Sequence, residues 1–456
     1  MLDILRAYQV EDVHKMVEKR RLINANEPGL GKTLETLMAI QLLEAKRVLV
    51  VAAPQPALGT WQWQTKKWLG EEVELYLGAS HKRQASWKRF TQSNSRFLVT
   101  NYVLARELLA EKPAIFDTMV FDEYHLGGLM NHTTTTWKAV CKYGRCKNLF
   151  LLTGTPVRKG PQDLWAPLHL LDPYRFPSYW GFVGKYCITT KDHFGSTIEA
   201  RPADPVKFKD LIDPYRIRRT KKKYLPELPD KNRFAVPLLL EGKQKQLYEQ
   251  LENDMMIDTP ETLIVSPNQA ANIVRMRQVL ITPRILGFNI RGAACDMIMQ
   301  MADDEFTNGN PVSICTPYRQ AIPFMIEDME KLGAKVYVIH GGMGLKALTV
   351  SQMFQKDTNP RRVLIYTISS GASFDAYASR TGIFNGYEWS AINNKQAEDR
   401  LHRLGQVEQV SIPYLVHIGT IDEMIMAKLD SRQEAENWIL DTDAVLANIK
   451  KRREQG

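Results

Sequence analysis

Residues 25–40 read ANEPGLGKTLETLMAI, and this stretch places a glycine-rich turn directly before a helical run. The turn follows an apolar stretch, LINAN, and the residues from Thr33 to Glu44 have the polar and apolar spacing of a helix. An apolar stretch, a turn with Gly29 and Gly31, and a helix in that order are typical of a layered α/β protein.

The same turn carries the residues of a phosphate-binding loop. Backbone N–H groups at the N-terminus of a helix can surround phosphate oxygens. Lys32 can then reach the β and γ phosphates of ATP, and the Thr33 hydroxyl can ligate Mg²⁺. Asn26 stands where the pattern GxxxxGK[ST] has its first glycine, so a plain glycine-rich turn with an exposed lysine stays an alternative.

The first third of the chain alternates apolar runs with polar helical stretches such as Ser80–Thr91. Continuous apolar runs that end in polar residues suit strands buried on both faces of a parallel sheet. In such sheets, functional side chains gather at the carboxyl ends of the strands. The runs are 47–54, 96–102, 118–125 and 148–156.

Two adjacent carboxylates end the third of these runs, VFDEYH at 120–125. Asp122 can hold Mg²⁺, and Glu123 can polarise a water molecule for attack on a phosphate. An acidic strand end that faces solvent is the alternative. Thr153, in LLTGTP at 151–156, ends the next run and can bond both to the carboxylate segment and to a bound strand.

The alternation of apolar runs and polar helical stretches stops after about residue 156 and resumes at about residue 291. We therefore predict an α/β protein with parallel-sheet domains at 1–156 and 291–456, and a mostly helical insertion and linker at 157–290. The second set of expected strands comprises 312–318, 335–340, 362–369, 381–386 and 409–416.

The stretch QAEDRLHRLGQ at 396–406 carries two arginines at helical spacing. On a helix, Gln396, Arg400 and Arg403 would share one face. Two such arginines can be aimed across a cleft at a γ-phosphate, where they would stabilise transition-state charge. A salt-bridged surface helix is the alternative.

The chain has 456 residues, and its 60 Lys and Arg against 51 Asp and Glu give a net charge of +9. A basic surplus favours a polyanionic partner. The five cysteines form no C-x-x-C pair, so no zinc ribbon is expected and a reducing compartment is indicated. No signal-peptide core and no membrane span are evident, so we expect a cytoplasmic protein in a bacterial or phage-infected cell, or a nuclear one in a eukaryote.

Together the motifs resemble the superfamily-2 helicases, and most closely their Swi/Snf-like branch. LRAYQ at 5–9 looks like the LRPYQ motif, in which the resemblance gives Arg6 and Gln9 a place beside the adenine. NEPGLGKT at 26–33 resembles DEMGLGKT, and RRTK at 218–221 resembles the RRxK signature. RLHRLGQ at 400–406 resembles RxHRxGQ, where Gln396 would also contact the nucleotide.

The resemblance implies two RecA-like domains that bind Mg²⁺ and ATP between them, with Lys32, Asp122, Glu123, Arg400 and Arg403 as catalytic residues. It also implies a nucleic-acid strand across both domains. The residues expected to contact that strand are Gln55, Trp61, Thr100, Asn101, Thr153, Pro317, His340, Gly341 and Thr367. Contacts of this kind go to phosphates, so we expect little dependence on base sequence.

Three stretches leave their role open. SSGASFD at 369–375 departs from the glycine-rich segment AGGxGxN of the family. The basic stretch 216–223 is either an extra phosphate contact or a solvated linker. Trp180 and Phe182 either stack on a base at a DNA junction or belong to the core of the insertion.

The resulting expectation is an ATP-dependent DNA translocase of a compact bacterial or phage type that works as a monomer on duplex, forked or four-way-junction DNA. Branch migration, fork regression and strand re-annealing are the expected activities. Alternatives are a motor that displaces proteins from duplex DNA, the motor subunit of a restriction or defence complex, and an ATP-gated binding module that does not hydrolyse ATP.

Overall fold

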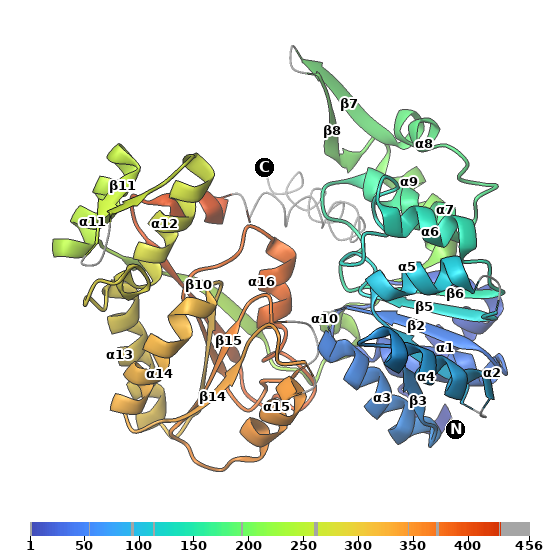
Figure 1. Ribbon diagram of the computed structural model, residues 1–456, viewed down its shortest axis with the longest axis horizontal. Helices are drawn as coiled ribbons and strands as arrows, with labels where there is room; N and C mark the ends of the chain where they lie inside the picture. The colour runs from blue at the N-terminus through green and yellow to red at the C-terminus, as the bar shows by residue number, and fades with distance from the viewer. Residues whose placement is uncertain are drawn as a thin grey trace, which may run out of the picture. The chain divides into compact units, whose positions relative to one another are not determined.

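The computed structural model describes residues 2–53, 55–92, 95–112, 115–192, 195–259, 263–344, 346–370, 374–427 and 429. These residues form two compact units (Figure 1). Unit 1 is Met1–Pro226, and unit 2 is Glu227–Asp430. The terminal segment from 431 onward lies outside the described residues.

Unit 1 is built on a seven-stranded parallel sheet in the order β3-β4-β2-β5-β6-β1-β9. Its strands are β1 (Arg21–Asn24), β2 (Val48–Ala52), β3 (Val73–Leu75), β4 (Phe97–Thr100), β5 (Thr118–Asp122), β6 (Asn148–Leu152) and β9 (Arg216–Ile217). The helices are α1 (Ala7–Lys19), α2 (Lys32–Leu42), α3 (Gln55–Leu69), α4 (Ser80–Gln92), α5 (Tyr102–Glu111), α6 (Thr135–Tyr143), α7 (Trp165–Leu171), α8 (Tyr179–Tyr186), α9 (Pro205–Ile212) and α10 (Lys221–Tyr224).

Both faces of this sheet are buried, as the continuous apolar runs predict. In β2, Val48 and Val50 belong to the cluster packed with α1 and α2, whereas Leu49 and Val51 belong to the cluster on the opposite face. Successive side chains of a strand point to opposite faces of the sheet. In a strand that is covered on both sides, each of these positions therefore faces an apolar core.

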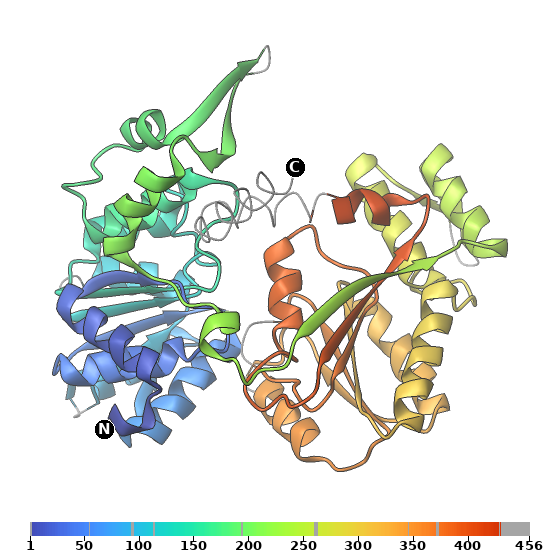
Figure 2. The same cartoon turned by 180° about the vertical axis from the view of Figure 1, so that it is seen from behind.

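Unit 2 contains a six-stranded parallel sheet in the order β10-β17-β16-β13-β15-β14. Figure 2 shows β10 beside β17, two strands that are far apart in the sequence. The strands are β10 (Lys231–Leu238), β13 (Val312–Thr316), β14 (Lys335–Ile339), β15 (Arg362–Thr367), β16 (Thr381–Phe384) and β17 (Val410–His417). The helices are α11 (Gly242–Asp254), α12 (Gln269–Ile281), α13 (Ala293–Thr307), α14 (Ile322–Lys331), α15 (Lys346–Lys356) and α16 (Ala391–Glu398).

Residues 157–290, predicted as a separate insertion, divide between the two units at Pro226. Helices α7, α8 and α9 pack into the core of unit 1, and β9 extends its sheet. From Glu227 onward, β10 extends the sheet of unit 2. Two antiparallel hairpins were not expected: β7 (Cys187–Asp192) with β8 (Gly195–Pro202), and β11 (Met256–Asp258) with β12 (Leu263–Val265).

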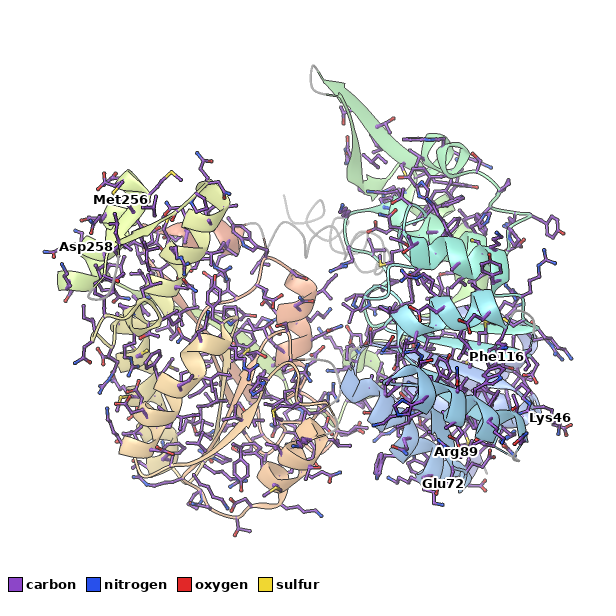
Figure 3. The ribbon with its side chains drawn as sticks, viewed as in Figure 1. Lys46, Glu72, Arg89, Phe116, Met256 and Asp258 are labelled. Carbon is purple, nitrogen blue, oxygen red and sulfur yellow. The ribbon has the colours of Figure 1, made fainter. Side chains whose placement is uncertain are left out.

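Side chains fill the space between the ribbons of each unit (Figure 3). In that view, Phe116 marks the core of unit 1, where its side chain is 3% exposed, and Met256 marks the hairpin β11–β12. Within the part of the chain that the structure describes, no helix has the length and apolar character that a membrane crossing needs.

Candidate active site at the strand ends of unit 1

The turn between β1 and α2 has the backbone conformation that its glycines allow. Gly29 and Gly31 have φ values of +91° and +93°, a region that residues with a side chain rarely adopt. A Cβ atom on Gly31 would also lie 2.3 Å from Nε2 of Gln9. Among the described residues, no side chain caps α2, so its first N–H groups are left for a ligand.

Lys32 and Thr33 begin α2 at the point where the turn ends. The Lys32 side chain is buried, and its Nζ donates a 2.8 Å hydrogen bond to the carbonyl oxygen of Asn26. Burial lowers the pKa of Lys32, while the charges of Glu123 and Asp122 act in the opposite direction. Lys32 therefore lies in the electrostatic field of both predicted carboxylates, and Thr33 is half-buried beside it.

The N-terminal helix α1 contacts the outer side of the turn. Gln9 Nε2 and Tyr8 Oη both donate to the carbonyl oxygen of Leu30, at 3.0 and 2.9 Å. The Arg6 backbone N–H donates to Gln9 Oε1 at 2.9 Å, and the Arg6 side chain is exposed. The resemblance placed Arg6 and Gln9 beside a nucleotide base, and the structure brings both to the edge of the turn that is predicted to bind phosphate.

Asp122 ends β5 and is held by two aromatic residues. Trp61 Nε1 donates a 2.8 Å hydrogen bond to Asp122 Oδ2, and Tyr102 Oη donates to the Asp122 carbonyl oxygen at 2.9 Å. Burial, followed by the charge of Glu123, raises the pKa of Asp122 to about 6. The Asp122 carboxylate is therefore ionised near neutral pH, and a nearby cation would stabilise this ionised form.

Glu123 has a strained backbone, with φ of +48°. A non-glycine residue in the left-handed region is held there by its surroundings, a pattern found at functional sites. Glu123 Oε2 lies 3.2 Å from His125 Nδ1, which is also 2.8 Å from Thr153 Oγ1. Burial raises the pKa of Glu123, but hydrogen bonding and charge from His125, with the charge of Lys32, lower it below the usual value.

The oxygen atoms of this cluster suit Mg²⁺, which prefers carboxylate and hydroxyl ligands and keeps several waters. Glu123 Oε2 is buried, with His125 Nδ1 3.2 Å away, and a carboxylate oxygen can accept more than one partner. Asp122 and Thr33 are the residues that would hold the ion beside phosphate oxygens at Lys32. Thus the residues present fit Mg²⁺ and a nucleoside triphosphate.

The basic stretch 216–223 is fastened to this turn, which the sequence did not reveal. Arg218 Nη1 donates to the carbonyl oxygens of Ala25 and Gly154, at 2.8 and 3.3 Å. Arg219 bonds Asp12 of α1 through Nε and Nη2 at 3.0 and 2.7 Å. These two arginines therefore bind protein groups around the phosphate turn, and neither role expected for them, phosphate contact or solvated linker, describes their contacts.

In unit 2 the predicted arginines do not share a helix face, because α16 ends at Glu398. Lys231 and Arg233 of β10 bind the buried Glu398 carboxylate, with Lys231 at 2.8 Å, and Lys231 also reaches Asp399. This anchor lies more than 160 residues away in the sequence, so local spacing could not predict it. Gln396 remains on α16 and is half-buried.

Arg400 and Arg403 lie in the turn after α16. Arg400 is 1% exposed, and its guanidinium carbon lies 3.9 Å from the centroid of the Phe374 ring. Burial, with the charge of Arg403, lowers the pKa of Arg400 to about 10. Arg403 is partly exposed, and its Nη1 donates to Asp375 Oδ1 at 2.6 Å. Residues 371–373 of the divergent segment lie outside the described residues.

Three predicted nucleic-acid contacts are buried instead. Trp61, Thr100 and Thr153 are each 0% exposed. Their polar atoms bond within the protein: Trp61 to Asp122, Thr100 to the Tyr76 carbonyl oxygen, and Thr153 to His125.

The other predicted contacts vary. Asn101 caps α5 by accepting from the Leu104 N–H, and Thr367 is buried at the end of β15. Pro317 and His340 are half-buried and Gly341 is exposed, so these three remain accessible. The Gln55 side chain lies outside what the structure describes.

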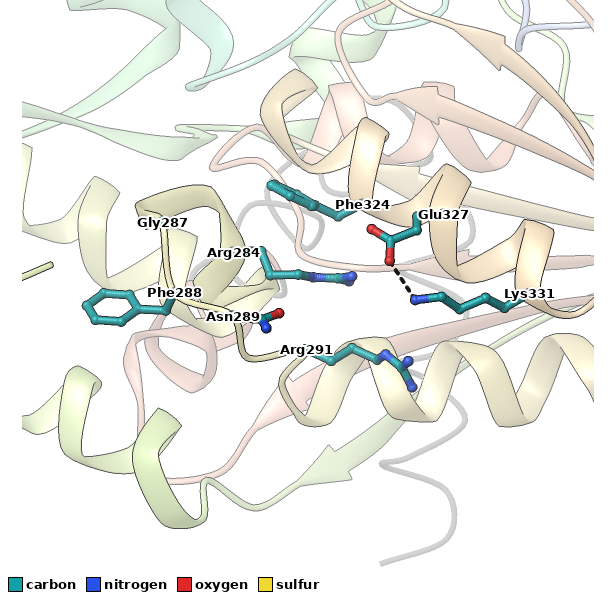
Figure 4. Close-up of a pocket in the computed structure, with 8 residues that line it drawn as sticks. All are labelled: Arg284, Gly287, Phe288, Asn289, Arg291, Phe324, Glu327 and Lys331. Carbon is teal, nitrogen blue, oxygen red and sulfur yellow. Dashed lines mark hydrogen bonds and ion pairs between the residues drawn. The ribbon is translucent and has the colours of Figure 1, made fainter. Parts of the chain in front are cut away.

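Unit 2 also has a pocket of about 510 Å³ (Figure 4). Its charged lining is already paired: Arg284 binds the buried Asp328, Arg291 binds Asp328 and Asp296, and Lys331 binds Glu327. Each cation that lines the pocket therefore already has a carboxylate partner among the described residues, and we assign no ligand to the pocket.

With this geometry in place, comparison with known proteins identifies the family. The family described as SNF2-related domain matches residues 8–285, more than half of the chain. The chain belongs to this SNF2-related family. The match extends from α1 through the glycine turn and the two carboxylates into unit 2, as far as residue 285.

Several curated relatives align with most of the chain. The probable ATP-dependent DNA helicase CHR23 of Arabidopsis thaliana is 25% identical over 451 residues, covering 93% of this chain and 42% of that protein. The DNA annealing helicase and endonuclease ZRANB3 of Mus musculus is 24% identical over 432 residues, covering 92% and 39%. The chain thus spans about two fifths of the length of these curated relatives.

Among solved structures, the Sulfolobus solfataricus SWI2/SNF2 ATPase core in complex with dsDNA matches 98% of this chain and 96% of its own. The identity is 21% and the TM-score is 0.44.

Proposed function

We propose that this chain is an ATP-dependent DNA translocase or helicase whose hydrolysis of ATP is stimulated by duplex or branched DNA. The observation that carries the proposal is the cluster at the strand ends of unit 1, where the buried Lys32 lies in the field of Asp122 and Glu123. Membership of the SNF2-related family supports DNA as the partner, because the named relatives are DNA helicases.

Within that function, we propose branch migration, fork regression and strand re-annealing as the activities to test first. The name of one relative, a DNA annealing helicase, supports this choice. The accessible residues Pro317, His340 and Gly341 would take part of the phosphate contact in unit 2.

The residues of the site divide the chemical work. Bound Mg²⁺ and ATP would supply the phosphoryl group and a divalent charge that neutralises the phosphate oxygens. Lys32 binds those oxygens, and Asp122 and Thr33 hold the ion. Glu123 is ionised at neutral pH and accepts the proton of a water molecule, while His125 fixes its orientation. Arg403 would supply a further positive charge from unit 2.

ATP hydrolysis with single-stranded DNA, linear duplex, fork, four-way junction and RNA, at one stated salt concentration, tests the proposal. We expect the highest rates with substrates that contain duplex DNA. Lys32→Ala should lower the stimulated rate by about 100-fold to 1,000-fold, because one phosphate-binding charge is lost. Lys46→Ala, an exposed lysine of the same unit, is the matched control and should leave the rate unchanged.

Stimulation by RNA alone would contradict the choice of DNA. An unchanged activity in Lys32→Ala would instead support a binding module without hydrolysis. Equal stimulation by linear duplex, fork and junction would favour a motor that displaces proteins from duplex DNA over one that remodels branches.

A further inference from the structure

The short helix α8 of unit 1 has one face in the core and one face in solvent. Phe182 is 4% exposed and packs against Tyr186 and Phe208, with ring centroids 5.1 and 6.1 Å away. Trp180, two residues earlier, is 74% exposed. The two aromatic residues that the sequence left undecided therefore have opposite environments, and only Trp180 is available to a partner.

A rigid aromatic cluster supports the exposed indole. The Trp180 ring lies 5.1 Å from the ring of Tyr179, which lies 4.3 Å from the His132 ring and 5.5 Å from that of Trp165. Ser178 caps the helix by accepting a 3.2 Å hydrogen bond from the Gly181 N–H. The Trp180 ring is thus presented on a fixed base, which lowers the entropy lost when a flat ligand binds to it.

Two positions on the rest of the exposed face of α8 are glycines, which carry no side chain. Gly181 and Gly184 lie on it, and glycine is the poorest helix former after proline. Neither has a positive φ, and a Cβ atom on Gly184 would meet nothing within 4 Å. Neither internal packing nor backbone conformation therefore requires Gly184. The absence of side chains leaves room for a ligand to lie against the helix beside the indole.

The charge of this segment has the sign that a nucleic acid requires. Residues 173–190 contain Arg175 and Lys185 and no aspartate or glutamate, and both cations are exposed. Lys185 is in no ion pair with a carboxylate among the described residues, and its Nζ lies 5.2 Å from the centroid of the Tyr186 ring. A protein-binding surface would instead present several contiguous apolar side chains, whereas Trp180 is flanked by two glycines and a lysine.

We propose that the exposed face of α8, formed by Trp180, Gly181, Gly184 and Lys185, binds an unpaired nucleobase. Trp180 stacks on the base and Lys185 contacts the adjoining phosphate, a combination that tolerates any base sequence. The hairpin β7–β8 begins directly after α8 and extends outward from unit 1 beside it (Figure 1). The inference rests on the function proposed above and adds a selectivity for DNA with single-stranded parts.

The test compares the affinity of the full chain for a fork with single-stranded arms and for a blunt duplex, by fluorescence anisotropy of labelled DNA at one salt concentration. Trp180→Ala should weaken fork binding about tenfold and leave duplex binding and duplex-stimulated ATP hydrolysis unchanged. Trp180→Phe, which keeps a ring, should retain most of the fork affinity. Trp63→Ala removes another tryptophan of unit 1, which is 47% exposed, and should not selectively weaken binding to the fork.

A second variant makes the result independent of the tryptophan. Gly184→Glu has room for its side chain and should weaken fork binding by repelling phosphate, whereas Gly184→Ala should not. Wild-type fork affinity in Trp180→Ala and Gly184→Glu would overturn the inference and assign this face to another partner. If the wild-type chain bound no DNA and hydrolysed no ATP with any polynucleotide, the proposed function itself would fail.

Discussion

In the proposed ATP site, Asp122 of unit 1 is supported by a buried neighbour, whereas Arg403 of unit 2 is supported near the surface. Asp122 is held by Trp61, whose ring is 0% exposed. Arg403 is held by Asp375, whose side chain is 43% exposed. A hydrogen bond away from water keeps most of its strength, while an ion pair in solvent is screened. The support in unit 1 should therefore matter more, and should depend less on salt.

Among the supporting residues, the largest effect is expected from Trp61→Phe, which keeps the ring and removes the N–H that binds Asp122. Hydrogen bonds to charged groups contribute about 1.5–3 kcal/mol, so the pKa of Asp122 should rise above its value of about 6. Asp122 must be ionised to hold Mg²⁺, so activity is lost as pH falls through this pKa. We expect the acidic limb of the ATPase pH profile to move upward by about one unit, and the Mg²⁺ requirement to rise about tenfold.

Trp63→Phe is the matched control, because its ring is exposed and lies over Lys67 instead of the site. Trp61 was also predicted to contact nucleic acid. If the Trp61→Phe variant bound DNA more weakly and had an unchanged Mg²⁺ requirement, Trp61 would be a nucleic-acid contact as predicted. The buried support of Asp122 would then not differ in importance from the exposed support of Arg403.

A smaller effect is expected from Asp375→Asn, which keeps the size of the side chain and removes its charge. The pair with Arg403 is partly exposed, so its loss should cost about 1 kcal/mol, or about a fivefold fall in kcat. The deficit should shrink as salt is added, because screening already weakens the wild-type pair. ATPase rates at low and high salt measure this.

Asp357→Asn provides the comparison within unit 2, since Asp357 pairs with Lys335 at 2.9 Å and does not contact either arginine of the site. It should leave kcat unchanged. A salt-independent loss in Asp375→Asn that equals the loss in Trp61→Phe would show that exposure does not separate the two supports.

The sequence predicted the sheets well because their strands are buried on both faces. The runs at 118–125 and 362–369 contain β5 and β15, whose residues are apolar on both sides of the sheet. β9 has two residues, too few for any period to be visible. The phosphate turn and the carboxylates were predicted for the same reason, since they follow directly from strand ends.

What the sequence could not provide were partners distant along the chain. Trp61 and Asp122 are 61 residues apart, and nothing local to Trp61 indicates that its N–H is used inside the protein. α16 ends at Glu398, whose carboxylate binds Lys231 and Arg233 of β10, so the helical spacing of Arg400 and Arg403 was misleading. The strain at Glu123 also has no sequence signal, because any residue type can be forced into that conformation by its neighbours.

The smallest effect is expected on the free energy of unfolding and concerns Glu35. This residue lies behind the glycine turn and is 0% exposed. Burial, followed by the charge of Asp12, raises the pKa of Glu35 from 4.5 to about 8. Asn24 Nδ2 donates to its carboxyl group at 2.7 Å. The folded chain therefore keeps a proton that the unfolded chain releases above pH 4.5, so this group makes the free energy of unfolding fall as pH rises from about 4.5 to about 8.

Glu35→Gln resembles the protonated acid and should remove this dependence. Relative to the wild-type chain, we expect the variant to have a Tm higher by a few degrees at pH 8.5, with the difference shrinking toward pH 6, as measured by thermal unfolding. Glu44→Gln, exposed just after the same helix, should show no such trend. A difference that grew toward acid would mean that Glu35 is ionised in the folded chain. In that case the turn would carry a buried negative charge behind Lys32, and it would bind a triphosphate less readily than the geometry implies.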